Sequence, residues 1–401
     1  MEKDNKMEKI VSLAKRRGFV YLGSEIYGGL AGTWDYGPLG AEMLYNIKEA
    51  WWKKFVSERE DIYGISSSII MPEAVWKASG HLENFTDPLG EEKFNTMFKS
   101  KVGAKEEEAT DVYLRPELAQ GMFVNFKNVI DSFHPKLPFG LAQIGKSFRN
   151  EISPRDFLFR VREFDLMEFE YFVRESEWEK HFEFWKEEMW NWIKDVGIDE
   201  KKVHELEVPE DDRAHYSKRT VDFEYDFPFG RKELYGLAYR TDHDLKNHKL
   251  DYFDEETKET FIPHVVEPTF GVGRTVLAIL DSAYTEDELG GEKRVFLKLK
   301  PQIAPVKVAV FPLLKNKLDL VDKAREVHKM IRKDISPIMF DDNGNIGKRY
   351  RRQDEIGTPY CVTIDFDTLE DDTVTVRDRD TGKQKRVAIK ELLGYIQDGL
   401  K

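Results

Sequence analysis

The sequence predicts an α+β fold, in which an antiparallel sheet flanked by helices forms residues 1–300 and a smaller α/β domain forms residues 301–401. Two beta-rich runs, at 139–151 and 159–173, are joined by a segment with Pro and Asp, a pattern typical of an antiparallel hairpin. Beyond residue 305 strand and helix patterns alternate, which indicates a separate α/β unit. Residues 298–305 contain two prolines and are interpreted as the linker.

Composition narrows the class of protein. The chain has 401 residues, a length that suggests two or three domains. It has no run of eighteen apolar residues, so we expect no membrane-spanning helix and no membrane partner. Its beginning lacks the apolar core of a signal peptide, which favours a cytoplasmic location. The single cysteine, Cys361, excludes a disulfide within the chain and a cysteine-based zinc site, and no zinc is expected.

Charge is spread unevenly along the chain. The net charge of −13 argues against a general nucleic-acid coat. Residues 301–401 carry 19 Lys and Arg against 17 Asp and Glu, whereas the other 300 residues carry 43 against 58. The tail domain is therefore less repelled by polyanions, which agrees with a boundary near residue 300.

The elements follow from periodicity and from Gly and Pro punctuation. The first part predicts a helix at 8–19, a Gly-rich stretch at 28–40, a long helix at 41–59, a strand at 65–72 ended by Pro72, a helix at 73–85, a polar loop at 86–110 and a strand turning into a helix at 113–126. A helical stripe of core residues follows the hairpin: Trp178, Phe182, Trp185, Met189, Ile193 and Val196.

Residues 199–260 give no clear assignment, and 264–284 predict a strand, a Gly-rich turn and an apolar helix. The tail predicts strands at 306–311, 337–341 and 360–365, helices at 316–333 and 346–356, a hairpin over 373–389 and a final helix.

The hairpin interleaves arginines, aromatic rings and carboxylates. Alternate residues of a strand share a face, so one face is predicted to present Arg149 and Glu151 on the first strand and Arg160, Arg162, Phe164, Leu166 and Glu168 on the second. Arginine forks suit phosphate oxygens, a ring suits a purine, and a carboxylate suits an ammonium group. The same pattern also fits an exposed face laced with salt bridges, and the residues alone leave both interpretations open.

Two further blocks decide between these interpretations. "RPE" at 115–117 precedes the hairpin, and "GVGR" at 271–274 follows it but matches neither a dinucleotide fingerprint nor a Walker motif. The combination resembles the class II aminoacyl-tRNA synthetases. Motif 1 corresponds to about 41–72, motif 2 (Phe-Arg-x-Glu, loop, Arg-x-x-x-Phe) to about 147–170, and motif 3 to about 265–284.

Within that class the chain is most similar to the glycyl-tRNA synthetases of the homodimeric type. The blocks that carry the resemblance are "GTWDYGPLG", "LRPELAQGMF", "FRNEISPRDFLFRVREFDLMEFEYF", "KELYGLAYRTDHDL", "EPTFGVGR" and "GNIGKRYRRQDEIGTPYCVTID". The resemblance implies a class II catalytic domain over 1–300 and an anticodon-binding domain over 301–401. It also implies activation of glycine by ATP, transfer of glycine to tRNA(Gly), and a homodimer formed through the motif 1 region.

The resemblance assigns roles to single residues. Catalytic roles fall on Arg149, Arg160 and Arg274, which would grip phosphates and the attacking carboxylate. The implied ATP-binding residues are Arg149, Asn150, Glu151, Phe159, Arg160, Phe164, Glu233, Leu234, Gly271, Gly273 and Arg274. Phe164 and Arg274 would sandwich the adenine, and Mg²⁺ would bridge the phosphates, with Glu233 and Glu267 as candidate ligands.

Glycine offers only its ammonium and carboxylate for recognition. The implied glycine-binding residues are Glu117, Glu168, Glu267 and Thr269. Thr269 stands where the family usually has serine, so the hydroxyl is kept and a methyl group is added. Because larger amino acids are refused by steric clash, no editing domain is required.

In the tail, "KRYRR" lies on a predicted helix, and Lys348, Arg349, Arg351 and Arg352 are the candidate RNA contacts. The chain departs from the family between "FTDPL" (85–89) and "FNTMF" (94–98), where only four residues, 90–93, stand in place of a longer insertion. A naturally minimal form and an engineered deletion both fit this. The segment 244–252 also looks shortened.

Two rival functions follow. Another class II synthetase, for histidine, threonine or proline, lacks support from the carboxylate pair and the "WDYGPLG" block. A non-catalytic synthetase-like protein would be expected to have lost the motif arginines, but Arg149, Arg160 and Arg274 all stand here.

Overall fold

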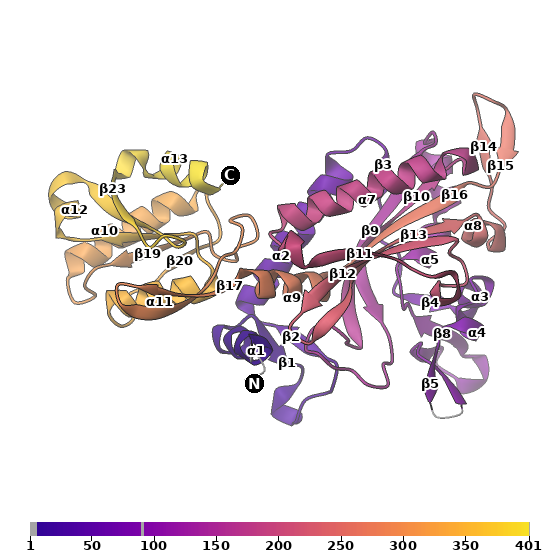
Figure 1. Ribbon diagram of the computed structural model, residues 1–401, viewed down its shortest axis with the longest axis horizontal. Coiled ribbons are helices and arrows are strands. Elements are labelled where there is room, and N and C mark those ends of the chain that lie inside the picture. Colours follow the sequence, from indigo (N-terminus) through magenta and orange to yellow (C-terminus); the bar gives the residue numbers. More distant parts are fainter. Residues whose placement is uncertain (1–5, 90–91, 401) are drawn as a thin grey trace.

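The computed structural model describes residues 6–89 and 92–400, and it has two bodies (Figure 1). The first is built on a seven-stranded, almost wholly antiparallel sheet, and the second on a five-stranded mixed sheet. Both sheets carry helices, which confirms the predicted α+β class. Among the described helices, none combines the length and the apolar character needed to cross a bilayer.

The large sheet has the strand order β11-β12-β13-β16-β10-β9-β3, with only β3 and β9 parallel. Its strands are β3 (Ile62–Gly64), β9 (Phe139–Phe148), β10 (Glu163–Val173), β11 (Val203–Glu207), β12 (Arg219–Phe227), β13 (Gly230–Thr241) and β16 (His264–Gly271). The predicted hairpin is β9–β10, in which Glu168 pairs with Gln143. On the other side of β10, Glu168 pairs with Thr269 of β16.

Alternation along β10 separates the two faces of this sheet. Met167, Phe169 and Tyr171 belong to the largest core cluster, which contains residues from α2 (Pro38–Trp52), α7 (Trp178–Asp195) and α9 (Val272–Ala283). Figure 1 shows α7 lying across the strands. Glu168 and Glu170 have the opposite parity and face away from these helices. One face is thus apolar and covered, and the other carries buried polar groups.

The predicted helical elements behind the sheet are confirmed. The aromatic stripe of α7 is buried as predicted, including Trp185 and Met189. Helix α2 begins at Pro38, where a missing N–H costs nothing, and continues through a π-helical turn, η2 (Lys53–Ser57). Before it lie α1 (Lys6–Arg17) and the small pair β1 (Val20–Leu22) and β2 (Trp34–Tyr36), separated by η1 (Glu25–Tyr27).

The polar face is bordered by a second group of elements. These are β4 (Ile70–Pro72), β7 (Lys99–Val102) and β8 (Thr110–Leu114) in one small sheet, the pair β5 (Thr86–Leu89) and β6 (Glu92–Asn95), and helices η3 (Glu106–Glu108), α3 (Glu73–Ala78), α4 (His81–Asn84), α5 (Ala119–Phe123) and α6 (Phe126–Phe133).

Three expectations for this region are wrong. Residues 86–110 hold three strands rather than a polar loop. The sequence did not indicate the last of them, β7, because its side chains are exposed on both faces and leave no apolar period. The strand at 65–72 is reduced to β4, and the helix at 73–85 is split at Gly80, whose φ is +77°. Within the short 90–93 connection, Gly90 and Glu91 lie outside the described residues.

The stretch at 199–260, which the sequence did not assign, supplies an edge of the large sheet. Besides β11–β13 it contains η5 (Glu200–Lys202), η6 (Glu210–Asp212), α8 (His243–Asn247) and the pair β14 (Tyr252–Asp254) and β15 (Glu259–Phe261), while η4 (Glu175–Glu177) precedes α7. A further pair, β17 (Tyr284–Leu289) and β18 (Glu292–Leu297), was not expected from the sequence. It follows the predicted strand and helix at 264–284, which are confirmed as β16 and α9.

The tail agrees with the predicted alternation. Its strand order is β20-β19-β21-β22-β23, and its elements are β19 (Val308–Pro312), α10 (Leu318–Arg332), β20 (Ile338–Phe340), α11 (Ile346–Ile356), β21 (Tyr360–Ile364), α12 (Phe366–Asp371), β22 (Thr373–Asp378), β23 (Gln384–Ala388) and α13 (Ile389–Leu400). The short α12 was not predicted, and Asp365 and Thr368 close a capping box at its start.

The two bodies pack against one another. Leu299, Ile303 and Ala304 of the proposed linker are buried in the core of the first body, together with Ile356 from α11. Residues 298–305 therefore do not form a free tether. The boundary at residue 300 stays a prediction, because apolar packing is continuous across it.

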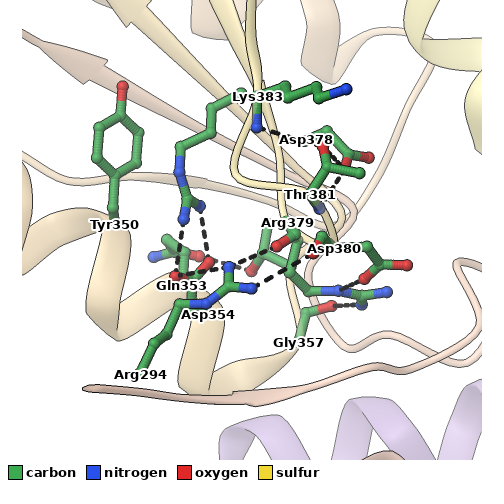
Figure 2. A network of polar contacts seen from close by, with 12 residues as sticks. Arg294, Tyr350, Gln353, Asp354, Gly357, Asp378, Arg379, Asp380, Thr381 and Lys383 are labelled. Atoms are coloured by element: carbon green, nitrogen blue, oxygen red, sulfur yellow. Dashed lines mark hydrogen bonds and ion pairs between the residues drawn. The ribbon is translucent and has the colours of Figure 1, made fainter. Parts of the chain in front are cut away.

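A buried polar network joins the β17–β18 pair to the tail (Figure 2). The Asp354 carboxylate accepts from the Arg377 guanidinium at 2.7 and 2.9 Å, and it lies 3.6 Å from Arg294 of β18. Arg294 also donates to the backbone oxygen of Arg379 at 2.7 Å. One buried carboxylate thus balances guanidinium groups from both bodies.

Replacing Asp354 with asparagine is expected to lower the free energy of unfolding by about 2 kcal/mol, because Arg377 loses a charged acceptor in a buried site. Urea unfolding followed by circular dichroism measures the loss. Asp342→Asn, in the loop before α11, is the control. If the two variants unfold at the same urea concentration, the network does not stabilise the tail.

Candidate active site

The polar face of the large sheet forms the floor of a cavity of about 370 Å³. The predicted ATP and glycine residues that line it are Glu117, Arg149, Glu151, Phe159, Arg160, Phe164, Glu168, Glu233, Leu234, Glu267, Thr269, Gly271, Gly273 and Arg274. Asn150 is the one predicted residue of these two sets that does not line it. The structure therefore gathers residues from four separate sequence blocks around one space.

The arginines of the hairpin do not lie on its strands, which corrects the predicted shared face. β9 ends at Phe148 and β10 begins at Glu163, so Arg149 and Arg160 belong to the connection between them. The connection folds on itself through a bridge between Arg155 and Arg160. Loops can aim long side chains into a cavity that a flat strand face could not reach.

The "RPE" block forms a fixed corner beside the cavity. Arg115 is 2% exposed, and its guanidinium donates to the backbone oxygens of Lys146 at 2.8 Å and Ser67 at 2.9 Å. The backbone N–H of Phe148 in turn donates to the Arg115 oxygen at 2.9 Å. Arg115 therefore joins the end of β8 to the end of β9, and this joint directs Glu117 into the cavity.

Arg149 lies between two aromatic rings at the cavity. Its guanidinium carbon is 5.1 Å from the Phe85 ring centre and 5.4 Å from that of Phe164. Its Nε donates to the Pro116 oxygen at 3.1 Å, so the side chain is held at one end while its terminal nitrogens stay available. No carboxylate of the described residues is paired with Arg149, so this cation suits an anionic ligand.

Arg160 and Arg274 are paired with acids at the same cavity. Arg160 contacts Glu151 at 2.5 Å and Asp87 at 3.0 Å. Arg274 contacts the Glu233 carboxylate at 3.0 Å and lies 4.4 Å from the Phe159 ring centre. Arg274 lowers the pKa of Glu233, which keeps that carboxyl ionised.

Gly271 and Gly273 let the chain turn into α9 at the cavity wall. Gly271 is extended and caps the helix, and a Cβ on Gly273 would lie 3.0 Å from the Leu158 oxygen. The helix thus begins at the cavity with its N–H groups directed toward an anion position.

At the cavity wall Glu168 and Glu267 meet the fully buried Glu170, and one carboxyl oxygen of each lies within 4.8 Å of the others. Glu168 and Glu170 are 2% and 0% exposed, and one oxygen of the first and both of the second have no hydrogen-bond partner among the described residues. Thr269 donates to the other Glu168 oxygen at 3.2 Å. Burial and the neighbouring Glu267 raise the pKa of Glu168 well above its usual value.

Arg240 offsets part of this negative charge. It is fully buried, and it contacts Glu267 and Asp244 at 2.8 Å each. Burial still raises the pKa of Glu267 to about 6, although Arg240 opposes the shift. The floor of the cavity keeps an excess of carboxyl groups, which favours a small cationic ligand.

Glu117 differs from the other acids. Burial alone would raise its pKa, but His81, Arg240 and a hydrogen bond from Gln120 together hold the pKa below its usual range. Gln120 donates to Glu117 at 3.2 Å and to Asp244 at 2.8 Å. Glu117 is therefore kept in its charged form, unlike Glu168 and Glu267, whose pKa values are raised.

Comparison with known proteins agrees with this geometry. The family profile described as "tRNA synthetase class II core domain (G, H, P, S and T)" matches residues 98–283, and the profile described as "Anticodon binding domain" matches residues 307–399. The protein of Clostridium acetobutylicum named "Glycine--tRNA ligase" is 45% identical over 466 residues and covers 100% of both chains. The chain belongs to the glycine–tRNA ligase family.

Other members of the glycine–tRNA ligase family give the same result. Relatives of that name from Thermobifida fusca and Streptomyces coelicolor are 46% and 45% identical, and each comparison covers 99% of both chains. The alignment with the Clostridium acetobutylicum relative spans 466 positions, whereas this chain has 401 residues. That relative therefore carries segments that this chain lacks.

The candidate RNA contacts of this family member are mostly engaged inside the protein. Arg349 is 1% exposed and donates to the backbone oxygens of Asp342 and Gly344, so its assignment to RNA is wrong. Arg352 contacts Asp341 at 2.7 Å, and Arg351 contacts Glu292 of β18. Of the four predicted RNA contacts, only Lys348 is both exposed and without an ion pair to another described residue.

Several residues at the cavity were not predicted from the sequence: Asp222 lines it, whereas Arg240, Asp244, Glu170 and His81 lie next to its lining residues. Arg240 and Asp244 stand in the block "KELYGLAYRTDHDL", but their spacing carries no site signal without the fold. Glu170 shares the parity of Glu168, which the alternation rule makes visible. His81 lies in the segment 73–85, which was predicted as a helix without a site. Asp222 lies in 199–260, which was not assigned.

Asp222 in the cavity wall gives a pH-dependent prediction. Burial, with Glu233 and Glu224 nearby, raises its pKa to about 7. Between about pH 4 and 7 the Asp222 carboxyl is protonated in the folded chain and ionised in the unfolded chain. The free energy of unfolding therefore falls as pH rises through that range. Asp222→Asn is expected to be more stable than wild type at pH 8, by on the order of 1 kcal/mol.

That gain should shrink toward zero by about pH 5, where Asp222 itself is protonated. Thermal unfolding of both proteins across this pH range measures the difference. A gain that stays constant with pH would show that Asp222 does not titrate there.

Proposed function

We propose that this chain is a glycine–tRNA ligase that forms glycyl-adenylate from glycine and ATP and transfers the glycyl group to the 3′ end of tRNA(Gly). The observation that carries the proposal is one cavity with arginines and rings at one side and buried carboxyl groups at the other. The first side suits a nucleoside triphosphate, and the second suits an ammonium group. Family membership supports the same reaction.

In the first step a carboxylate oxygen of glycine attacks the α-phosphorus of ATP, and pyrophosphate leaves. Arg149 neutralises the charge that develops on the α-phosphate, and Arg160 holds the γ-phosphate after exchanging one of its acid partners for it. Phe164 and Arg274 bracket the adenine, while Glu151 and the backbone of Leu234 meet its edge; Asn150 does not line the cavity and keeps no role here. In the second step the ribose hydroxyl of tRNA takes the glycyl group and AMP leaves.

The ammonium of glycine is assigned to Glu117, Glu168 and Glu267, with the Thr269 hydroxyl completing the site. The buried Oε1 of Glu168, which has no partner among the described residues, supports this, because an ammonium supplies the donor that it lacks. A larger side chain would enter a space that is closed by buried groups, so selection for glycine needs no editing step.

Mg²⁺ fits beside Glu233 better than beside Glu267. The Glu233 side chain is 47% exposed at the cavity, whereas Glu267 is committed to Arg240 and grouped with Glu168 and Glu170. When bound between phosphates, Mg²⁺ would offset the charge of the pyrophosphate leaving group. Glu233 would then orient it through one carboxylate oxygen.

The remaining parts of the proposal concern partners and place. The tail would contact the anticodon of tRNA(Gly), with Lys348 and Arg351 as the exposed members of the predicted basic set. A homodimer would form through the motif 1 region, where Tyr45 on α2 is 60% exposed. A cytoplasmic location fits a protein that serves translation.

The test is glycine-dependent exchange of pyrophosphate into ATP, with alanine and serine as competitors for the site, followed by charging of tRNA(Gly). Exchange with glycine alone and subsequent charging are expected. Exchange without charging would limit the proposal to the first step. Folded protein that shows no exchange with any amino acid would instead support the non-catalytic tRNA-binding alternative.

A further inference from the structure

A histidine lies behind the carboxylate of Glu117. His81 Nε2 is 3.1 Å from Glu117 Oε2, and the side chains are 2% and 9% exposed. His81 opens α4, directly after the left-handed Gly80, so the helix break that the sequence did not predict is what aims the imidazole at Glu117. Nothing else in the proposed mechanism uses this histidine.

The imidazole is held on every side. Trp76 and Phe85 contact the ring with centroids 5.4 Å away each. The Ser79 hydroxyl lies 2.8 Å from Nδ1, and it is itself 3.3 Å from the Trp76 backbone oxygen. A buried ring fixed by two aromatic neighbours and a hydroxyl has one orientation rather than several.

The chemistry of the pair defines the direction of the hydrogen bond. An ionised carboxylate only accepts, so Nε2 carries the hydrogen and donates it to Glu117 Oε2. Gln120 donates to Oε1 at 3.2 Å. Each Glu117 oxygen thus accepts one hydrogen bond from a protein side chain, His81 or Gln120, and each keeps a lone pair for a donor in the cavity.

We propose that His81 is a positioning residue that orients the Glu117 carboxylate for the ammonium of the amino acid substrate. This rests on the proposed function, because Glu117 must bind the substrate for His81 to act through it. When a residue that hydrogen-bonds to a ligand-binding side chain is removed, the affinity for the ligand commonly falls by about tenfold or more.

The experiment compares His81→Leu with His81→Gln in glycine-dependent pyrophosphate exchange. Leucine keeps bulk without a donor, and glutamine returns an N–H close to the position of Nε2. We expect His81→Leu to raise the KM for glycine about tenfold while the KM for ATP stays within about twofold, and His81→Gln to recover most of the loss. His181→Leu is the matched control, since His181 is a buried histidine that contacts Tyr171 on the other side of the sheet.

A second arm separates positioning from general stability. In a Glu117→Gln background, His81→Leu should add little to the KM for glycine, because the group through which it acts is already altered. Effects that multiply in the double variant, or a His81→Leu protein whose KM values for glycine and ATP rise together, would overturn the proposal. Wild-type protein without glycine-dependent exchange would refute the proposed function itself, whereas wild-type exchange unaffected by His81→Leu would refute only this inference.

Discussion

Arg149→Ala is expected to lower glycine-dependent pyrophosphate exchange by about a thousandfold. Unlike Arg160 and Arg274, Arg149 has no carboxylate partner among the described residues, and it is stacked between Phe85 and Phe164. Its charge is therefore preorganised for the phosphate group at which negative charge develops, and removal of one such donor typically costs two to three powers of ten. The effect should fall on kcat as well as on kcat/KM.

The control for this result is Arg155→Ala in the same connection. The Arg155 side chain is 58% exposed, and it contacts only Asp156, at 3.6 Å, among the described ion pairs. Its removal should leave exchange within about twofold of wild type. Equal losses in both variants would mean that the connection is simply sensitive to change, and the assignment of Arg149 to the phosphate would be wrong.

Arg240→Met is expected to lower the free energy of unfolding by about 3–5 kcal/mol. Arg240 is fully buried and faces Glu267, Asp244 and, at 4.0 Å, Glu117. Methionine fills much of the space but leaves these carboxyl groups without their cation, in a site where water cannot replace it. Glycine binding should fall as well, because the carboxyl groups would take up protons instead of holding an ammonium.

Arg231→Met on the same strand is the matched control. Arg231 is about half exposed and contacts Asp226 at 2.8 Å, so its loss should cost less than about 1 kcal/mol. Chemical unfolding of both variants gives the comparison. If Arg240→Met and Arg231→Met lower the free energy of unfolding equally, the buried cluster around Arg240 does not carry the stability assigned to it.

The large features of the fold could be predicted because they leave periodic signals. The alternation in β9 and β10, the stripe of α7 and the strand and helix order of the tail all depend on a buried apolar face. β7 could not be predicted, since both its faces are exposed and no residue type is forced. β12 does alternate, with Val221, Phe223 and Tyr225 buried, but no strand was predicted among the charged residues of 199–260.

The resemblance supplied the residues of the candidate site, and the structure supplies their geometry. Glu168 and Thr269, which the resemblance assigned to glycine, lie opposite one another on β10 and β16. The arginines were placed on strands, although the hairpin ends before them, and the end of a strand is not encoded by alternation alone. Arg349 was assigned to RNA because a basic run on a helix does not tell which member is buried.

Contacts that depend on distant segments had no signal in the sequence. His81 meets Glu117 only because β8 and α4 lie side by side, and Arg240 meets Glu267 only through the pairing of β13 with β16. Such pairs join residues that are far apart in the chain, so spacing cannot reveal them. The structure is needed to find the groups that hold the binding residues in place.

The central claim is that one cavity holds the nucleotide and glycine together. Calorimetric binding of a stable sulfamoyl analogue of glycyl-adenylate, compared with the alanyl analogue, tests it most directly. We expect one site per chain, binding of the glycyl analogue at least about a hundredfold tighter than that of the alanyl analogue, and loss of binding in Arg149→Ala. Equal affinity for both analogues, or binding that survives in Arg149→Ala, would contradict it.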